Sequence, residues 1–254
     1  MEISPHDSAI EFRNVSYRLK SGAELLHNLS LDIRRGETLV LLGRSGSGKT
    51  TTLKLINRIL TASEGEIRVD GRPLCQWDVI RLRRMMGYVI QDVGLFPHYT
   101  VERNIGLVPK IEGWPAKRVQ ERVHELLQLV GLEPQMASRY PRELSGGQQQ
   151  RVGVARALAV DPPFLLMDEP FGALDPLTRS ELQREFLGLQ ARLQKTVVFV
   201  THDLREALLL GSRIALLDAG RLVGVHTKAE FNASQDSLVL AYKRAFDTGV
   251  GEHS

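Results

Sequence analysis

The sequence has little of what marks a secreted, membrane-spanning or metal-stabilised protein. Its 254 residues include one cysteine, Cys75, so no intrachain disulfide can form. No CxxC pair or Cys/His array indicates a structural metal, and a reducing compartment is the natural expectation. No apolar stretch approaches the roughly 20 residues that span a bilayer. The polar start, residues 1–9, predicts no secretory signal.

The charges are nearly balanced, because 33 lysines and arginines face 30 acidic residues. No basic run forms the stripe that nucleic-acid-binding proteins usually carry, so no nucleic-acid partner is expected. The composition, 43% hydrophobic and 25% charged, is that of an ordinary globular protein. The length fits one large domain or two small ones.

Two kinds of apolar pattern predict two kinds of sheet. Thr38–Leu42, Phe164–Met167 and Val197–Val200 are continuous apolar runs, which are typical of parallel strands covered on both faces. Between residues 10 and 33 the apolar residues instead alternate, which predicts antiparallel strands with one buried face. The middle of the chain, about 100–158, reads as mostly helical. The fold prediction is therefore an α/β core beside an antiparallel β-subdomain and a helical subdomain.

Local signals place individual helices and turns. A helix is expected to start at Pro115 and to stop at Gly131. Asp175-Pro176 predicts a capped helix start. After Gly220 a hairpin and one or two short helices are expected.

The segment Gly43-Arg44-Ser45-Gly46-Ser47-Gly48-Lys49-Thr50 fits the phosphate-binding motif G-x-x-x-x-G-K-S/T. It follows a buried strand and opens a predicted helix, so backbone N–H groups and the helix N-terminus favour an anion. Lys49 is expected to reach the β- and γ-phosphates of a nucleotide, and the Thr50 hydroxyl to bind Mg²⁺. The neighbouring Thr51 belongs to the same candidate site. The alternative is a glycine-rich turn that happens to precede a lysine.

Two acids follow the buried run that ends at Met167. Asp168 can hold Mg²⁺ or its water, and Glu169 can act as general base on an attacking water. The alternative is that both acids merely solvate a loop.

The segment Ser145-Gly146-Gly147-Gln148, preceded by Leu144, reads as a second helix start with bare backbone N–H groups for an anion. One chain would then hold two phosphate-binding elements but a single full metal site. Two copies facing each other head to tail resolve this, each giving the segment to the γ-phosphate that its partner holds.

Together these motifs resemble the ATP-binding cassette (ABC) transporter ATPases, over residues 10 to about 231. Leu144–Gln148 matches the family's signature. The resemblance implies that Gln91 contacts Mg²⁺ and the attacking water, that Asp175 lies in a loop running across the dimer, and that His202 contacts the γ-phosphate. It also places Tyr17 where an aromatic ring stacks on adenine.

Some of these single residues have plainer readings. Tyr17 can be an ordinary core aromatic on a strand, and His202 a helix-capping or buried histidine. Leu95, Phe96 and Pro97 resemble part of the groove that receives a short helix of the membrane subunit, or they are core residues. The implied domain layout is a single ABC domain, 1–254. Its core and β-subdomain occupy about 1–95 and 160–235, its helical subdomain about 96–159, and a short tail 236–254.

The resemblance implies a peripheral subunit at the cytoplasmic face of the cell membrane. Its partners are a second copy or a paralogous ATPase, transmembrane permease subunits and, indirectly, a solute-binding protein. Residues 168–175 and 91–101 resemble bacterial importers. Residues 104–110 with Trp114 are similar to importers of osmoprotectants such as glycine betaine, choline or carnitine. The end at residue 254 leaves no room for the regulatory CBS pair of many such proteins or for the β-rich domain of sugar importers. The alternatives are a polar amino-acid importer, or a repair or regulatory ATPase.

Overall fold

The computed structural model describes residues 8–248, so the two ends of the predicted 1–254 domain lie outside the described residues. The described chain forms two compact units. Within the described residues, one comprises 8–79 and 196–248, the other 80–195. The predicted subdomain boundaries near 95, 159 and 235 stay predictions.

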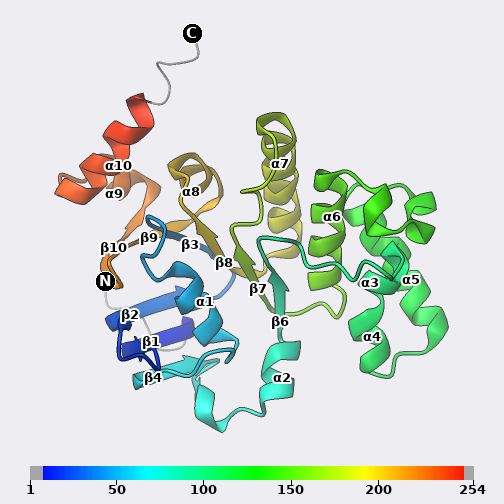
Figure 1. The fold of residues 1–254 in the computed structure, drawn as a ribbon, viewed down its shortest axis with the longest axis horizontal. Coiled ribbons are helices and arrows are strands. Elements are labelled where there is room, and N and C mark those ends of the chain that lie inside the picture. The colour runs from blue at the N-terminus through cyan, green and yellow to red at the C-terminus, as the bar shows by residue number, and fades with distance from the viewer. Residues whose placement is uncertain (1–7, 249–254) are drawn as a thin grey trace. The chain divides into compact units, whose positions relative to one another are not determined.

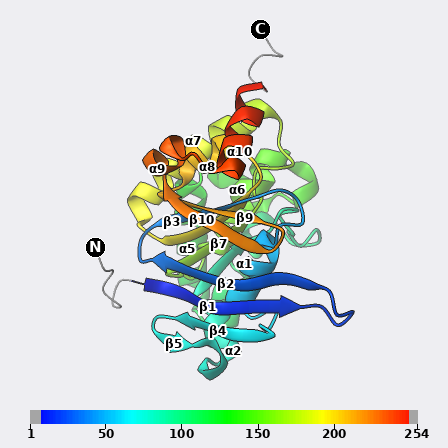
Figure 2. The same ribbon diagram turned by 90° about the vertical axis from the view of Figure 1, so that its left-hand side faces the viewer.

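The first unit contains an antiparallel sheet of four strands in the order β2-β1-β4-β5, as the alternating pattern predicted. Figure 2 shows β1, β2 and β4 side by side. Leu19 continues the alternation of the sequence but lies beyond the end of β1 and is 39% exposed. The strands are β1 (Ser8–Arg18), β2 (Glu24–Arg34), β4 (Glu64–Val69) and β5 (Arg72–Pro73).

The same unit contains a second group of strands around β3, which is parallel to both β8 and β9. Every residue of β3 and β8 is buried, which explains their unbroken apolar runs. Strand β10 pairs antiparallel with β9, so the hairpin predicted after Gly220 instead has Gly220 in its turn, with its first strand before that glycine. These strands are β3 (Thr38–Leu42), β8 (Thr196–Thr201), β9 (Arg213–Asp218) and β10 (Arg221–Thr227). The helices of the unit are α1 (Lys49–Ile56), the 3-10 turn η1 (Leu74–Gln76), α8 (Leu204–Leu210), α9 (Lys228–Ala233) and α10 (Ser237–Thr248). The last two are the orange and red helices of Figure 1.

A buried charge network joins β9 to the antiparallel sheet. The Arg213 guanidinium donates to Asp32 Oδ2 at 3.0 Å and to Glu37 Oε1 at 3.1 Å. Burial raises the pKa of Glu37 even though Arg213 lies beside it. Beyond the other end of β9, His27 N–H donates to Gly220 O at 2.9 Å, which ties β2 to the β9–β10 turn.

The second unit combines two parallel strands with most of the helices, as expected for the middle of the chain. Strand β6 pairs with β7 and ends at Val89. The strands are β6 (Met86–Val89) and β7 (Phe164–Asp168). The helices are α2 (Val79–Arg84), α3 (Val101–Ile105), α4 (Leu107–Ile111), α5 (Ala116–Leu129), α6 (Gly146–Ala157) and α7 (Pro176–Leu193), with 3-10 turns η2 (Pro134–Ser138) and η3 (Pro141–Glu143).

The helix boundaries of this unit follow the predicted caps. Helix α5 starts directly after Pro115, and Gly131 lies two residues past its end with φ +66°. The Asp175 side chain accepts the backbone N–H of Thr178 and so caps α7. Among residues 8–248 no helix is long and apolar enough to cross a membrane.

Candidate functional site

The phosphate-binding motif lies between β3 and the N-terminus of α1. Lys49 is the first residue of α1 and only 4% exposed. Its Nζ donates to the carbonyls of Gly43 at 2.8 Å and Arg44 at 3.0 Å, so the loop wraps around the ammonium group. A strand, a tight loop and a helix N-terminus in this order form the backbone arrangement that binds nucleotide phosphates.

Two glycines of this loop are required by space. A Cβ on Gly43 would lie 2.3 Å from Ser47 Oγ and 2.5 Å from the backbone O of Leu217. A Cβ on Gly48 would lie 2.5 Å from Leu26 Cδ2, and Gly48 has φ +100°, which favours glycine. The loop is further fixed by Gly220, whose N–H donates to Ser47 O at 3.2 Å. The motif is therefore a tight loop that is held in place by neighbouring segments of the same unit.

Ser47 places inside the loop a buried hydroxyl without a hydrogen-bond partner in the described part of the chain. Its Oγ is buried and has no hydrogen-bond partner among the described residues, and the residue is 3% exposed. Buried polar groups in proteins are almost always satisfied, so an orphaned hydroxyl in a phosphate-binding loop fits a bound polar ligand.

Tyr17 and His202 belong to the same unit as this loop. Tyr17 pairs across β1–β2 with Leu26, the residue that lies over Gly48, and it is half-buried instead of a core aromatic. His202 directly follows β8 and is exposed, which excludes a buried histidine. The cap of the following helix α8 is Asp203, which accepts the N–H of Arg205. Both plainer readings of His202 are therefore wrong.

The two acids of the second unit differ in environment. Asp168 is the last residue of β7 and 8% exposed, so it does not merely solvate a loop. The Tyr88 phenol hydrogen-bonds to its carboxylate. Burial, followed by the charge and the hydrogen bond of Asp168, raises the pKa of Tyr88 to about 12, so the phenol stays a neutral donor.

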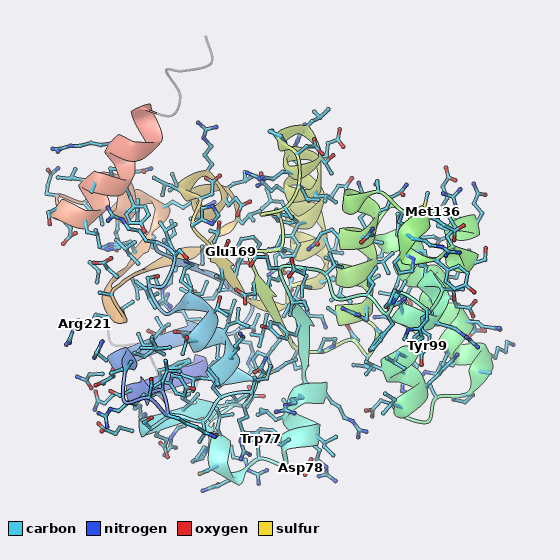
Figure 3. The ribbon with its side chains drawn as sticks, viewed as in Figure 1. Trp77, Asp78, Tyr99, Met136, Glu169 and Arg221 are labelled. Carbon is cyan, nitrogen blue, oxygen red and sulfur yellow. The ribbon has the colours of Figure 1, made fainter. Side chains whose placement is uncertain are left out.

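Glu169 is one residue beyond β7, near the centre of Figure 3. Its φ is +44°, a conformation that a non-glycine residue seldom adopts and that is frequent at functional sites. Gly172 N–H donates to Glu169 O at 3.1 Å and closes the turn after the acid.

The signature segment begins α6. Ser145 Oγ accepts the N–H of Gln148 at 3.3 Å, and Gln148 Oε1 accepts the N–H of Ser145 at 3.0 Å. This reciprocal capping box fixes the predicted helix start.

The structure brings this segment next to the Asp175 loop. A Cβ on Gly147 would lie 2.6 Å from Thr178 Cγ2 in the first turn of α7, so glycine allows the two helix N-termini to approach closely. A Cβ on Gly146 would be in ordinary contact with Leu174 at 3.5 Å.

Gln91 is exposed and follows β6 by two residues. Its loop is held by α6, because Arg156 donates to the carbonyls of Val93 at 2.6 Å and Gly94 at 2.7 Å. Gly153 admits Val93, since a Cβ there would lie 2.6 Å from Val93 Cγ1.

A groove of about 520 Å³ opens beside this loop in the same unit. Its wall includes three large apolar side chains that are strongly exposed, namely Ile80, Phe96 and Ile111. Leu95 is half-buried, whereas Phe96 and Pro97 are exposed, so the reading of this trio as core residues is wrong.

The sequence interpretation missed the residues that support the motifs from elsewhere in the chain. Leu217 and Gly220 hold the phosphate-binding loop, Thr178 faces the signature glycine, and Tyr88 holds Asp168. Of these four residues, only Tyr88 could have been noticed in the sequence, because it is an aromatic residue three positions before Gln91.

A model of the family described as "ABC transporter" matches residues 26–172. The chain belongs to the ABC transporter family. The "Glycine betaine/carnitine/choline transport ATP-binding protein OpuCA" of Bacillus subtilis (strain 168) is 53% identical over 87% of this chain. That match covers 58% of the relative, so the chain spans little more than half the length of this ABC protein.

Solved ABC structures share the fold. CbiO1 from Clostridium perfringens, described as part of the ABC transporter complex cbiONQ, superposes with a TM-score of 0.83 at 28% identity, covering 96% of this chain and 98% of that one. The dimeric post-hydrolysis ATP-binding cassette MJ0796, bound to ADP and Pi, has a TM-score of 0.76 at 34% identity, covering 86% and 98%. The predicted P-loop ABC fold is thereby confirmed.

Proposed function

We propose that this chain is the ATP-binding and ATP-hydrolysing subunit of an importer. The observation that carries the proposal is the Gly43–Thr50 loop, tightly supported between β3 and α1, with the buried and unpartnered Ser47 Oγ inside it. Such a loop gives backbone donors, a helix N-terminus and a lysine to one polyphosphate.

The proposed roles follow from side-chain chemistry. Lys49 binds the phosphate oxygens, and the half-buried ring of Tyr17 stacks on adenine. His202 donates to the γ-phosphate, and Glu169 accepts a proton from the attacking water. Each of these residues stands at the position of the matching residue in the ABC motifs.

The donor set for a metal ion consists of hard oxygens: the Thr50 hydroxyl, the Asp168 carboxylate and the Gln91 amide oxygen. Mg²⁺ prefers such ligands and keeps several waters, so few protein groups suffice. When bound, Mg²⁺ neutralises charge on the phosphates.

Pairing of two cassettes completes the proposed reaction. The segment Ser145–Gln148 forms the N-terminus of α6, where Ser145 and Gly146 are exposed. This N-terminus lies beside the Asp175 loop, as expected for a surface that faces a partner's γ-phosphate. The related MJ0796 cassette is described as dimeric. The partner is a second copy or a paralogous ATPase, and ATP favours the pair because it binds in the interface.

The groove beside the Gln91 loop is the proposed docking site for a permease segment. Exposed Ile80, Phe96 and Ile111 give it the apolar wall that an amphipathic helix needs. The chain would act at the cytoplasmic face of the membrane through this contact.

The proposed cargo is a quaternary-amine osmoprotectant such as glycine betaine, choline or carnitine. The support is the OpuCA relative, whose name states these solutes, at 53% identity. The cargo binds elsewhere in the transporter, so the test must use the assembled system with its binding protein.

The experiment compares the wild-type chain with Glu169→Gln, which keeps shape and removes the base. We expect ATP hydrolysis by the wild type, and a loss of at least about a hundredfold in turnover with ATP binding retained in the variant. Turnover at the wild-type rate would refute the role of Glu169. In reconstituted vesicles, ATP-driven uptake of labelled glycine betaine supports the cargo. Uptake of a polar amino acid alone, or hydrolysis stimulated by DNA without any permease, would favour the alternatives.

A further inference from the structure

Tyr88 lies on the same face of its strand pair as Asp168. In the parallel register Tyr88 is opposite Leu166. Asp168 is two residues after Leu166 on β7, and side chains two residues apart on a strand point to the same face. The Tyr88 and Asp168 side chains therefore lie on the same face of the strand pair. The phenol hydrogen-bonds to the Asp168 carboxylate.

The same tyrosine also forms part of the groove wall. It lines the groove of about 520 Å³ together with Ile80, Phe96 and Ile111. The side chain is only half-buried, unlike its neighbours Gly87 and Val89 in β6. One residue thus contacts both the groove and the carboxylate proposed to bind Mg²⁺.

We propose that Tyr88 is a positioning residue that fixes the orientation of the Asp168 carboxylate and makes it sensitive to what occupies the groove. The proposal rests on the proposed function, because Asp168 matters as a metal ligand only in a nucleotide-hydrolysing chain. A hydrogen bond from a neutral phenol restricts the rotation of a carboxylate. A segment that pushes on the ring from the groove changes the position of the hydroxyl, and with it the carboxylate.

The first test is Tyr88→Phe, which removes the hydroxyl and keeps the ring. Bound Mn²⁺ is measured by electron paramagnetic resonance at increasing metal concentration, with a non-hydrolysable ATP analogue present. We expect the half-saturating Mn²⁺ concentration to rise about tenfold, the cost of a hydrogen bond to a charged group. Analogue binding without metal should not change. Tyr140→Phe, which removes an exposed hydroxyl of the same unit, is the matched control and should behave as wild type.

A thermal unfolding curve accompanies each variant, so that loss of fold is distinguished from loss of metal affinity. A folded Tyr88→Phe chain with wild-type Mn²⁺ affinity would overturn the proposal. Asp168→Asn is measured beside it. If that variant also keeps its Mn²⁺ affinity, the metal assignment of the proposed function fails, whereas an effect of Asp168→Asn alone leaves that function intact.

The second test occupies the groove chemically. Ile111 is 64% exposed, so Ile111→Cys in a Cys75→Ser background gives one thiol on the groove wall for N-phenylmaleimide. We expect labelling to change the half-saturating Mn²⁺ concentration when Tyr88 is present, and to have no effect in the Tyr88→Phe chain. Labelling of Val223→Cys, far along the sequence on β10, is the control. An equal effect of the label with and without the Tyr88 hydroxyl would overturn the link to the groove.

Discussion

Replacing Gly43 by alanine tests whether the phosphate-binding loop needs its close packing. The added Cβ would overlap Ser47 Oγ at 2.3 Å and the backbone O of Leu217 at 2.5 Å. The serine can rotate, but the Leu217 carbonyl belongs to β9 and cannot move without distorting that strand. Overpacking of this kind costs about 2–3 kcal/mol, near the upper half of the usual range.

The loop can escape this overlap only by moving away from β9, which displaces the backbone donors. We therefore expect ATP affinity to fall about 30- to 100-fold, since each 1.4 kcal/mol corresponds to a tenfold change. Binding of a fluorescent ATP analogue measures this fall, and denaturant unfolding measures the free energy of the fold. The double variant Gly43→Ala with Ser47→Ala should stay impaired, because the backbone overlap with Leu217 persists.

Gly71→Ala is the matched control. Gly71 lies in the β4–β5 turn with φ +73°, and a Cβ there meets nothing within 4 Å. Alanine should cost about 1 kcal/mol of stability through its backbone conformation alone, with no change in ATP affinity. The reasoning fails if Gly43→Ala binds the analogue like wild type, or if Gly71→Ala weakens binding as much.

Three further predictions concern packing and charge. Gly147→Ala should lower turnover and cost about 1–3 kcal/mol of stability, and adding Thr178→Ser, which removes the methyl 2.6 Å away, should restore both in unfolding and ATPase assays. Arg213→Met should cost about 3 kcal/mol of unfolding free energy, because it leaves the buried Glu37 carboxylate without its guanidinium partner. Arg156→Gln should loosen the loop after Gln91, seen as faster hydrogen exchange there with analogue binding unchanged.

Local patterns predicted local structure well. The run Thr38–Leu42 coincides with β3, because a strand buried on both faces leaves an unbroken apolar signature. The cap at Asp175 was equally readable, since a side-chain acceptor three residues before a helical N–H is a property of the local sequence. Both features depend on neighbours within a few residues.

Contacts between distant segments were not predictable in the same way. The backbone O of Leu217 closes the space beside Gly43, although the two residues are more than 170 positions apart in the sequence. The apolar periodicity of either segment does not predict that the two are in contact. The hydrogen bond between Tyr88 and Asp168 depends on the parallel register of β6 and β7. The apolar pattern of the two strands does not determine this register. The sequence therefore offers the motif residues as candidates, whereas the residues that hold them in place are seen only in the structure.

Helix α6 explains how the separate motifs of the second unit can respond together. Its first turn carries the signature segment and packs through Gly147 against the start of α7, next to Asp175. Its last turn carries Arg156, which grips the loop after Gln91. A rigid helix transmits a displacement from one end to the other. If the signature segment faces a partner's nucleotide, as proposed above, a shift at that end would reach the loop beside the groove without any motion inside the helix.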